Sequence, residues 1–204
     1  MSTPKTKKSK TAMKSGRGRP RSPEVREKII KAAYELLIEV GFMDLTIEGV
    51  AAKASVGKPT IYRRWKSKGE LAMDAFLEMV TPEIAFPDTG SAQEDFREQM
   101  YKIVKMMNSS RGEVLANVIG CGQADADLLC AFRENWLIPR RQDATRIFER
   151  GIERGDIAPD IDTEVAIDAL YSPFFYRLLL KHQPLTNEFI DNLLDIVFSG
   201  LENS

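Results

Sequence analysis

The sequence has few of the residues from which catalytic and metal sites are usually built. Its 204 residues include two cysteines and one histidine. Cys121 and Cys130 lie nine positions apart, a separation that matches no zinc-ligand spacing, so we interpret both as core thiols of a protein from a reducing compartment. His182 is expected at the surface near a helix end. Because a nucleophile motif, a phosphate-binding loop and a metal-ligand cluster are all missing, we predict a protein that is not an enzyme and that needs no metal or cofactor.

Long apolar runs and strand patterns are missing as well. No stretch of about 18 apolar residues occurs, so no membrane-spanning helix is predicted. The cationic N-terminus lacks the apolar segment of a secretory signal, and we expect a cytoplasmic protein. Apolar residues nevertheless make up 43% of the chain, enough for the core of one large domain or two small ones. Because their spacing is helical, the predicted fold class is all-α.

The formal net charge of −1 conceals a division into a basic and an acidic part. Residues 1–69 contain 17 Lys and Arg against 6 Asp and Glu, whereas residues 70–204 contain 12 against 24. Such a division indicates a polyanionic partner for the N-terminal part. The acidic remainder would repel DNA, which confines any contact with DNA to the N-terminal face.

Residues 46–70 have the pattern of two short helices joined by a tight turn. The first helix has an apolar face formed by Ile47, Val50, Ala51 and Ala54. Thr46 is placed to cap this helix, and the small residues 55–57 interrupt the pattern. In the second helix Ile61 and Trp65 would point inward together. Its outer faces then carry Lys58, Thr60, Tyr62, Arg63 and Arg64.

Such a helix fits the DNA major groove, where its first turn can reach base edges while flanking cations and hydroxyls hold phosphates. The alternative is a solvated basic helix of some other helical protein. The segment resembles the helix-turn-helix of the TetR family of bacterial transcription regulators. The matching positions are Thr46, Val50, Ala51, Ala54, Val56, Lys58, Thr60, Ile61, Tyr62, Trp65, Ser67, Lys68, Glu70 and Leu71. Two positions depart from the family pattern, since Ser55 replaces the usual turn glycine and Gly57 the usual capping serine.

Residues 1–21 form a basic arm with almost no large apolar side chain, so we expect it to be disordered. Behind this arm the resemblance implies two folded domains. Residues 22–67 would form a three-helix helix-turn-helix DNA-binding domain. Residues 68–204 would form a helical ligand-binding and dimerisation domain, with about nine helices in the whole chain.

Two groups of residues are candidates for contact with double-stranded DNA. In the motif, the expected base or nearby phosphate contacts are Lys58, Pro59, Thr60 and Arg63, and the expected backbone contacts are Thr46, Tyr62 and Lys68. In the arm, residues 17–20 resemble an AT-hook core. The arm would then follow a minor groove through Arg17, Arg19 and Arg21, unless it is only a solubilising tail. One recognition helix reads few base pairs, so we expect a dimer on a pseudo-palindromic operator with half-sites roughly 34–36 Å apart or more.

Caps and breakers divide the chain into helices. We expect them over residues 22–41, 46–54, 58–65, 68–80, 91–108, 113–122, 125–154, 163–182 and 186–201. Arg111 and Gly112 are expected to break the chain before the sixth of these. Pro139 is expected to kink or break the helix over 125–154.

The resemblance also implies a cavity for a small-molecule inducer inside the C-terminal domain. The residues expected to line it are Met100, Tyr101, Val104, Met107, Phe132, Trp136, Phe174 and Tyr176. Methionine and aromatic walls suit a flat or hydrophobic molecule. The alternative for each residue is an ordinary place in the core. Ligand binding would favour a separation of the two DNA-binding heads that no longer fits the operator, as in a repressor released by its inducer.

The last two helices carry apolar side chains on more than one face, so each needs cover on two sides. One cover is the protein's own core, and the other is the same pair of helices in the second subunit of an isologous homodimer. The expected interface residues are Val165, Ala169, Phe175, Leu179, Phe189, Ile190, Leu193, Leu194 and Val197. The alternatives are a monomer with a thick core and, for function, a nucleoid-organising protein that binds A·T-rich DNA without a ligand.

Overall fold

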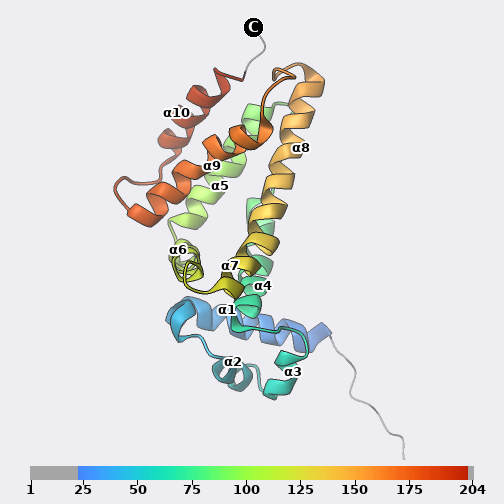
Figure 1. Cartoon of the computed structure of the whole chain (residues 1–204), viewed down its shortest axis with the longest axis vertical. Coiled ribbons are helices and arrows are strands. Elements are labelled where there is room, and N and C mark those ends of the chain that lie inside the picture. Colours follow the sequence, from blue (N-terminus) through green and yellow to red (C-terminus); the bar gives the residue numbers. More distant parts are fainter. Residues whose placement is uncertain (1–22, 202–204) are drawn as a thin grey trace, which may run out of the picture.

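The computed structural model describes residues 23–201, which form an elongated array of helices with no strand among them (Figure 1). The head at the lower end of Figure 1 consists of α1 (Pro23–Asp44), α2 (Ile47–Lys53) and α3 (Lys58–Tyr62). The body consists of α4 (Lys68–Val80), the 3₁₀ turn η1 (Thr81–Ile84), α5 (Ala92–Met107), α6 (Ser110–Gly122), α7 (Ala126–Phe132), the π turn η2 (Arg133–Leu137), α8 (Ile138–Arg154), α9 (Thr163–Leu180) and α10 (Asn187–Phe198). The all-α expectation is confirmed.

The head owes its boundaries to local caps and to one glycine. Gly41 ends the regular part of α1, where the backbone adopts φ 75°. Glycine suits this position because a residue with a side chain would be strained at that φ. The Thr46 hydroxyl accepts a hydrogen bond from the Gly49 amide at 3.0 Å and starts α2. The Ser67 hydroxyl likewise accepts from the Glu70 amide at 3.1 Å and starts α4. Both capped starts agree with those predicted from the sequence.

Helix α4 joins the head to the body and is fixed to both. The indole of Trp65, just after α3, donates to Asp74 of α4 at 2.8 Å. Arg26 of α1 pairs with Asp74 at 3.0 Å and also with Glu78. On the body side, the ring of Phe76 lies 5.7 Å from that of Trp136. Helix α4 is therefore in direct contact both with Trp65 at the end of the head and with Trp136 of the body.

The expected break at Arg111 and Gly112 is wrong, because both residues lie in the first turn of α6. The chain turns at Ser109, whose hydroxyl accepts from the Arg111 amide at 3.2 Å and caps the helix. Gly112 is required by packing, since a Cβ there would lie 1.9 Å from the Met107 carbonyl oxygen. The glycine was interpreted as a breaker, whereas it permits a close approach between α5 and α6.

Pro139 does not end its helix. The chain stays helical from α7 through η2 into α8, and the irregularity takes the form of the π turn just before the proline. Proline supplies no amide hydrogen, so the regular ladder must be interrupted near this point. Trp136, which lies in the π turn, is 5% exposed and packs into the body.

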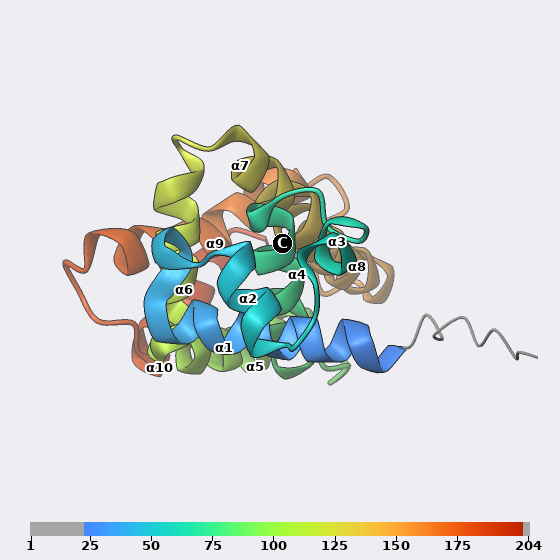
Figure 2. The same cartoon turned by 90° about the horizontal axis from the view of Figure 1, so that it is seen from below.

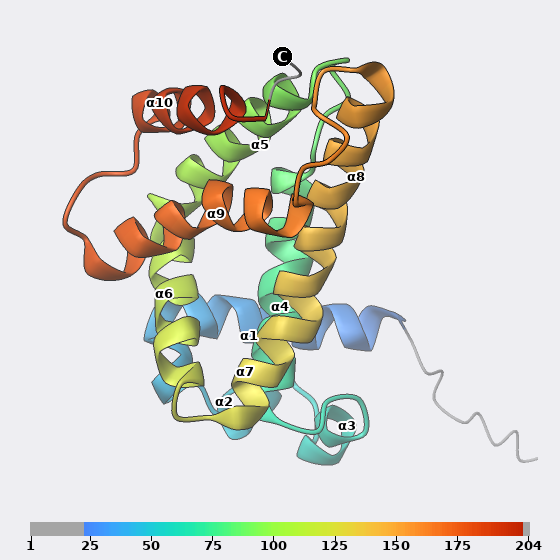
Figure 3. The same cartoon turned by 45° about the horizontal axis from the view of Figure 1, so that its top comes forward.

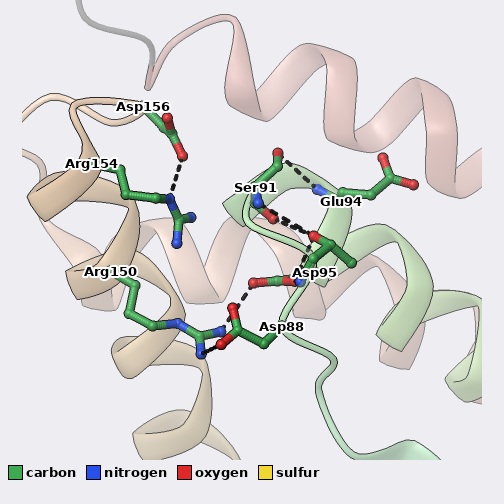
Figure 4. A network of polar contacts seen from close by, with 8 residues as sticks. Asp88, Ser91, Glu94, Asp95, Arg150, Arg154 and Asp156 are labelled. Carbon is green, nitrogen blue, oxygen red and sulfur yellow. Dashed lines mark hydrogen bonds and ion pairs between the residues drawn. The ribbon is translucent and has the colours of Figure 1, made fainter.

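An ion pair between the buried Asp95 of α5 and the partly exposed Arg150 of α8 links these two helices at the far end of the body (Figure 4). Asp95 is fully buried and accepts from Arg150 at 3.0 Å and from the Thr89 amide at 2.7 Å. Arg150 also pairs with Asp88 at 3.2 Å. Close by, the rings of Phe96 and Phe148 are 4.9 Å apart and form the core between α5 and α8. Between residues 23 and 201, none of the helices combines the length and the apolar character needed to cross a bilayer.

Candidate functional site

The turn between α2 and α3 places a short helix at the end of the molecule. Ser55 adopts φ 55°, so a serine takes the left-handed conformation that the resemblance assigns to a glycine. Gly57 is the N-cap of α3 and Pro59 lies in its first turn. Ile61 is fully buried and Trp65 is 4% exposed, so both anchor α3 to the head as expected.

The outer face of α3 presents most of the residues expected to meet DNA. Lys58, Pro59, Tyr62 and Arg63 are exposed, and Thr60 is half-buried. Seen from below in Figure 2, α1, α2 and α3 lie at the near end of the molecule, so this face is unobstructed by the body. A polar helix anchored by two buried side chains and open on its other side has the geometry for insertion into a groove.

Lys58 is paired with a carboxylate of α2. Its ammonium lies 2.9 Å from the Glu48 carboxylate, and both side chains are more than half exposed. The hydrogen bond to Glu48 raises the pKa of Lys58, and the same bond lowers the pKa of Glu48. The pair ties α3 to α2 in the free protein. Glu48 would compete with a phosphate for Lys58.

Lys68 does not take the outward position expected for a phosphate contact. Its ammonium donates to the carbonyl oxygens of Phe42 at 3.0 Å and Met43 at 3.2 Å, and it lies 4.4 Å above the Phe42 ring. These carbonyls belong to the short turn that follows Gly41 at the end of α1. Lys68 thus joins α4 to α1 inside the head. The arm residues Arg17, Arg19 and Arg21 lie outside the described residues.

The body contains a cavity of about 50 Å³, enough for a few water molecules. Its walls are mostly apolar, and they include Met107, Trp136 and Phe174 from the expected set. They also include Phe175, which was expected at the dimer interface. A molecule larger than a few waters would have to enlarge the cavity. Flexible methionine and aromatic side chains in the walls make such a change feasible.

The other residues expected in the cavity lie elsewhere. Met100, Val104 and Phe132 are buried in the core, as the alternative interpretation held. Tyr101 donates its hydroxyl to Asp191 of α10 at 2.6 Å. Tyr176 is 58% exposed, with its ring 4.5 Å from that of His182. Helical spacing alone could not separate these positions from those that face the cavity.

Four polar side chains line the cavity that the sequence did not single out for it. Gln99 is 1% exposed and donates to the Ile84 carbonyl at 3.3 Å. Its amide oxygen accepts from the Tyr171 hydroxyl at 3.0 Å. Burial raises the pKa of Tyr171, which therefore stays neutral. The other two are Arg140 and Arg141. The sequence feature that could have indicated a polar group in the cavity is Gln99, which lies within the apolar stripe of α5 between Phe96 and Ile103.

The outer faces of α9 and α10 retain exposed apolar side chains. On α9 these are Val165, Ala169, Tyr176, Leu179 and Leu180, and on α10 the most exposed is Ile196 at 74%. Phe189, Leu193 and Val197 are half-buried. Ile190 and Leu194 are fully buried in the chain's own core, so these two cannot lie on an outer interface as expected. In Figure 3 the two helices lie on the side of the body away from the head.

Two family models match consecutive parts of the chain. One, described as bacterial regulatory proteins of the tetR family, matches residues 29–75, and the other, a tetracyclin repressor-like C-terminal domain, matches residues 86–197. The uncharacterized HTH-type transcriptional regulator YdeS of Bacillus subtilis (strain 168) is 37% identical over 93% of this chain and 96% of its own length. The DNA-binding transcriptional repressor TetR of Mycobacteroides abscessus is 29% identical over 83% of this chain and 89% of its own length.

Solved structures agree with these matches. The TetR family transcription regulator SCO0332 superposes with a TM-score of 0.78 and 35% identity, over 88% of this chain and all of its own. The fold is also similar to that of the transcriptional regulator FadR from Bacillus subtilis in complex with stearoyl-CoA, with a TM-score of 0.63 and 20% identity over 86% of this chain and 99% of its own.

Proposed function

The chain belongs to the TetR family of helix-turn-helix transcription regulators, and from this premise we propose that it is a dimeric repressor that a small amphipathic molecule releases from a palindromic operator. The observation that carries the proposal is the position of two features at opposite ends of α4. An exposed polar recognition helix lies at one end, and a mainly apolar cavity lies beside the other.

The DNA-binding part rests on the exposed side chains of α3. Lys58 and Pro59 in the first turn would meet base edges, and Arg63 would meet bases or phosphates. Thr46 and Tyr62 (53% exposed) remain available for the DNA backbone. The repressor of Mycobacteroides abscessus, which is similar over most of its length, supports repression as the output.

The proposal of a dimer is supported by the exposed apolar side chains of α9 and α10. Val165 is 62% exposed and Ile196 is 74% exposed, and the α9 residues recur along one face of the helix. Burial of such a face against its own copy removes apolar area from water, which favours association. Two heads held at a fixed separation would then read two half-sites.

The proposal of an inducer is supported by the cavity and by a solved structure of the same fold that contains a ligand. The structure of FadR from Bacillus subtilis contains stearoyl-CoA, an amphipathic molecule. In this chain, a ligand that enlarges the cavity would displace Trp136 and, through its contact with Phe76, the linking helix α4. A coupling free energy of about 1–3 kcal/mol is typical for such an effect.

The experiment that tests the proposal is a selection of genomic DNA fragments by the purified full-length protein and by a chain that begins at residue 22. A single palindromic motif that both proteins select supports a dimeric operator-binding regulator, with the arm as an aid to affinity. Diffuse enrichment of A·T-rich fragments that disappears with the arm contradicts the proposal. It would favour the nucleoid-organising protein that the arm's Arg17 to Pro20 run suggests.

A further inference from the structure

Arg140 is a largely buried cation with little inside the protein to neutralise it. Its side chain is 16% exposed, and within the described part of the chain its one ion pair is a distant contact of 3.9 Å with Asp143. Among residues 23–201 its guanidinium donates no hydrogen bond, and its other neighbour is the Trp136 ring, 5.5 Å from Cζ. Burial lowers the pKa of Arg140, yet a guanidinium stays charged at neutral pH. A buried charge without a close partner costs stability.

The adjacent Arg141 differs from Arg140 because its guanidinium has close ion-pair and hydrogen-bond partners. Arg141 also borders the cavity, but its guanidinium pairs with both Glu164 and Asp168 of α9. It also donates to the Glu164 carbonyl oxygen at 3.2 Å. Arg141 thus joins α8 to α9, a structural role that Arg140 does not share.

Arg140 lines both the inner cavity and a groove on the outside of the body. The groove has a volume of about 380 Å³, and it runs between the loop at residues 85–88 and helix α8. Its other cations are already paired, Arg146 with Asp143 at 2.7 Å and Arg150 with Asp88 and Asp95. Arg140 is therefore the cation that remains available at the point where the groove meets the cavity.

We propose that the cavity binds an amphipathic carboxylate, whose apolar body lies among Met107, Trp136 and Phe174 and whose carboxylate pairs with Arg140. The planar fork of the guanidinium matches a carboxylate in two parallel hydrogen bonds. The Gln99 amide lies on the same cavity and keeps one N–H that can donate to the carboxylate, while the Tyr171 hydroxyl, which donates to the Gln99 oxygen, holds this amide in place. The inference rests on the proposed inducer and names its chemical class.

The first test compares matched acids and alcohols by isothermal titration calorimetry of the full-length dimer. Decanoate is paired with decanol, and 2-naphthoate with 2-naphthalenemethanol. We expect each acid to bind roughly 10- to 100-fold more tightly than its alcohol. Arg140→Gln should remove this difference and leave the affinity for the alcohol unchanged. Arg146→Gln is the matched control, because Arg146 lies on the same helix with 65% of its side chain exposed, and it should keep the difference.

The second test uses stability and needs no ligand. Arg140→Met should raise the Tm of the free protein or leave it unchanged, because an apolar side chain of similar length replaces a largely buried charge whose paired carboxylate is 3.9 Å away. Arg141→Met should lower the Tm, since it leaves Glu164 and Asp168 without their partner. Equal losses of Tm in the two variants would show that Arg140 has a structural role, and would overturn the inference.

Three binding results would also overturn the inference: equal affinities for acid and alcohol, a preference for acids that survives in Arg140→Gln, or no binding of either acid at roughly 1 mM. Operator binding is measured on the same preparations, so that the two proposals can fail separately. A protein that binds its operator and is released by the alcohols alone has an inducer but no anion site. A protein that selects no operator contradicts the proposed function whatever the acids do.

Discussion

Replacement of Lys68 by methionine distinguishes a lysine that stabilises the head from one that binds DNA. In the structure the ammonium is used by the carbonyls of Phe42 and Met43 and by the Phe42 ring. A buried hydrogen bond from a charged group contributes about 1.5–3 kcal/mol. Lys68 is only half-buried, so we expect its hydrogen bonds together to contribute about 1–2 kcal/mol to the free energy of unfolding. For a chain of this size the loss corresponds to a fall in Tm of about 2–8 °C.

The same variant should leave the salt dependence of operator binding unchanged. Each lysine–phosphate contact contributes about 0.9 to the slope of log K against log salt, so a dimer that loses one contact per head would lose about 1.8. Fluorescence anisotropy with labelled operator between roughly 50 and 200 mM salt measures this slope. Lys58→Met is the matched control, since Lys58 is exposed on α3 and should lower the slope with little change in Tm. A Lys68→Met protein with a smaller slope and an unchanged Tm would refute the reasoning.

Three further predictions concern the dimer, a helix contact and the recognition helix. Val165→Asp combined with Ile196→Asp should give a monomer in sedimentation velocity, with the helical circular dichroism retained, because both side chains are exposed in the isolated chain; a dimer that persists contradicts the proposed interface. Gly112→Ala should lower the unfolding free energy by about 1–3 kcal/mol or more, because its Cβ would overlap the Met107 carbonyl. Gly120→Ala, where nothing lies within 4 Å, should instead stabilise α6 by roughly 0.5–1 kcal/mol in urea denaturation, and similar effects of the two changes would refute this packing argument. Glu48→Gln should tighten operator binding, because it frees Lys58 and removes a negative charge near the phosphates; unchanged binding would show that Glu48 does not compete with the phosphates, and weaker binding that the pair has to be intact on DNA.

The helix starts that were predicted correctly depend on interactions within one turn. Thr46, Ser67 and Ser91 each accept a hydrogen bond from the backbone amide three residues later. Such a cap can be predicted from the residue types at the start of a helix. The start of α6 was missed because Gly112 was interpreted as a breaker. Its actual role depends on Met107 of the preceding helix, and a contact between two helices is not visible in local spacing.

The division between core, cavity and outer surface was harder to predict for a related reason. Helix α9 is apolar around most of its circumference, so periodicity could not assign one stripe to the core and another to the interface. On α10, Ile190 and Leu194 lie in the core, because the helix packs against α5. Arg140 was not assigned to the cavity, because the cavity walls come from α5, α8 and α9 together, and the arrangement of these helices is not visible in local spacing.

The contacts between the cavity and the recognition segment form a short continuous path. Trp136 in the cavity wall packs on Phe76 of α4, and Asp74 on the same helix accepts from the Trp65 indole that follows α3. A ligand that moves Trp136 would therefore shift α4, and with it the position of α3. Spatial continuity alone does not establish coupling, which requires a measured interaction free energy.

Phe76→Leu tests this path directly. The leucine keeps an apolar side chain at a position that is 1% exposed, but it removes the ring that meets Trp136. We expect the variant to bind operator and decanoate separately with near-normal affinity, while the loss of operator affinity caused by decanoate shrinks by about 0.5–2 kcal/mol. Tyr101→Phe is the control, because it removes the hydrogen bond to Asp191 on the far side of the body and should leave the coupling intact. If Phe76→Leu retained the full effect of decanoate while Tyr101→Phe reduced it, the coupling would run through α5 and α10 to the dimer interface, and the movement of α4 would be its consequence.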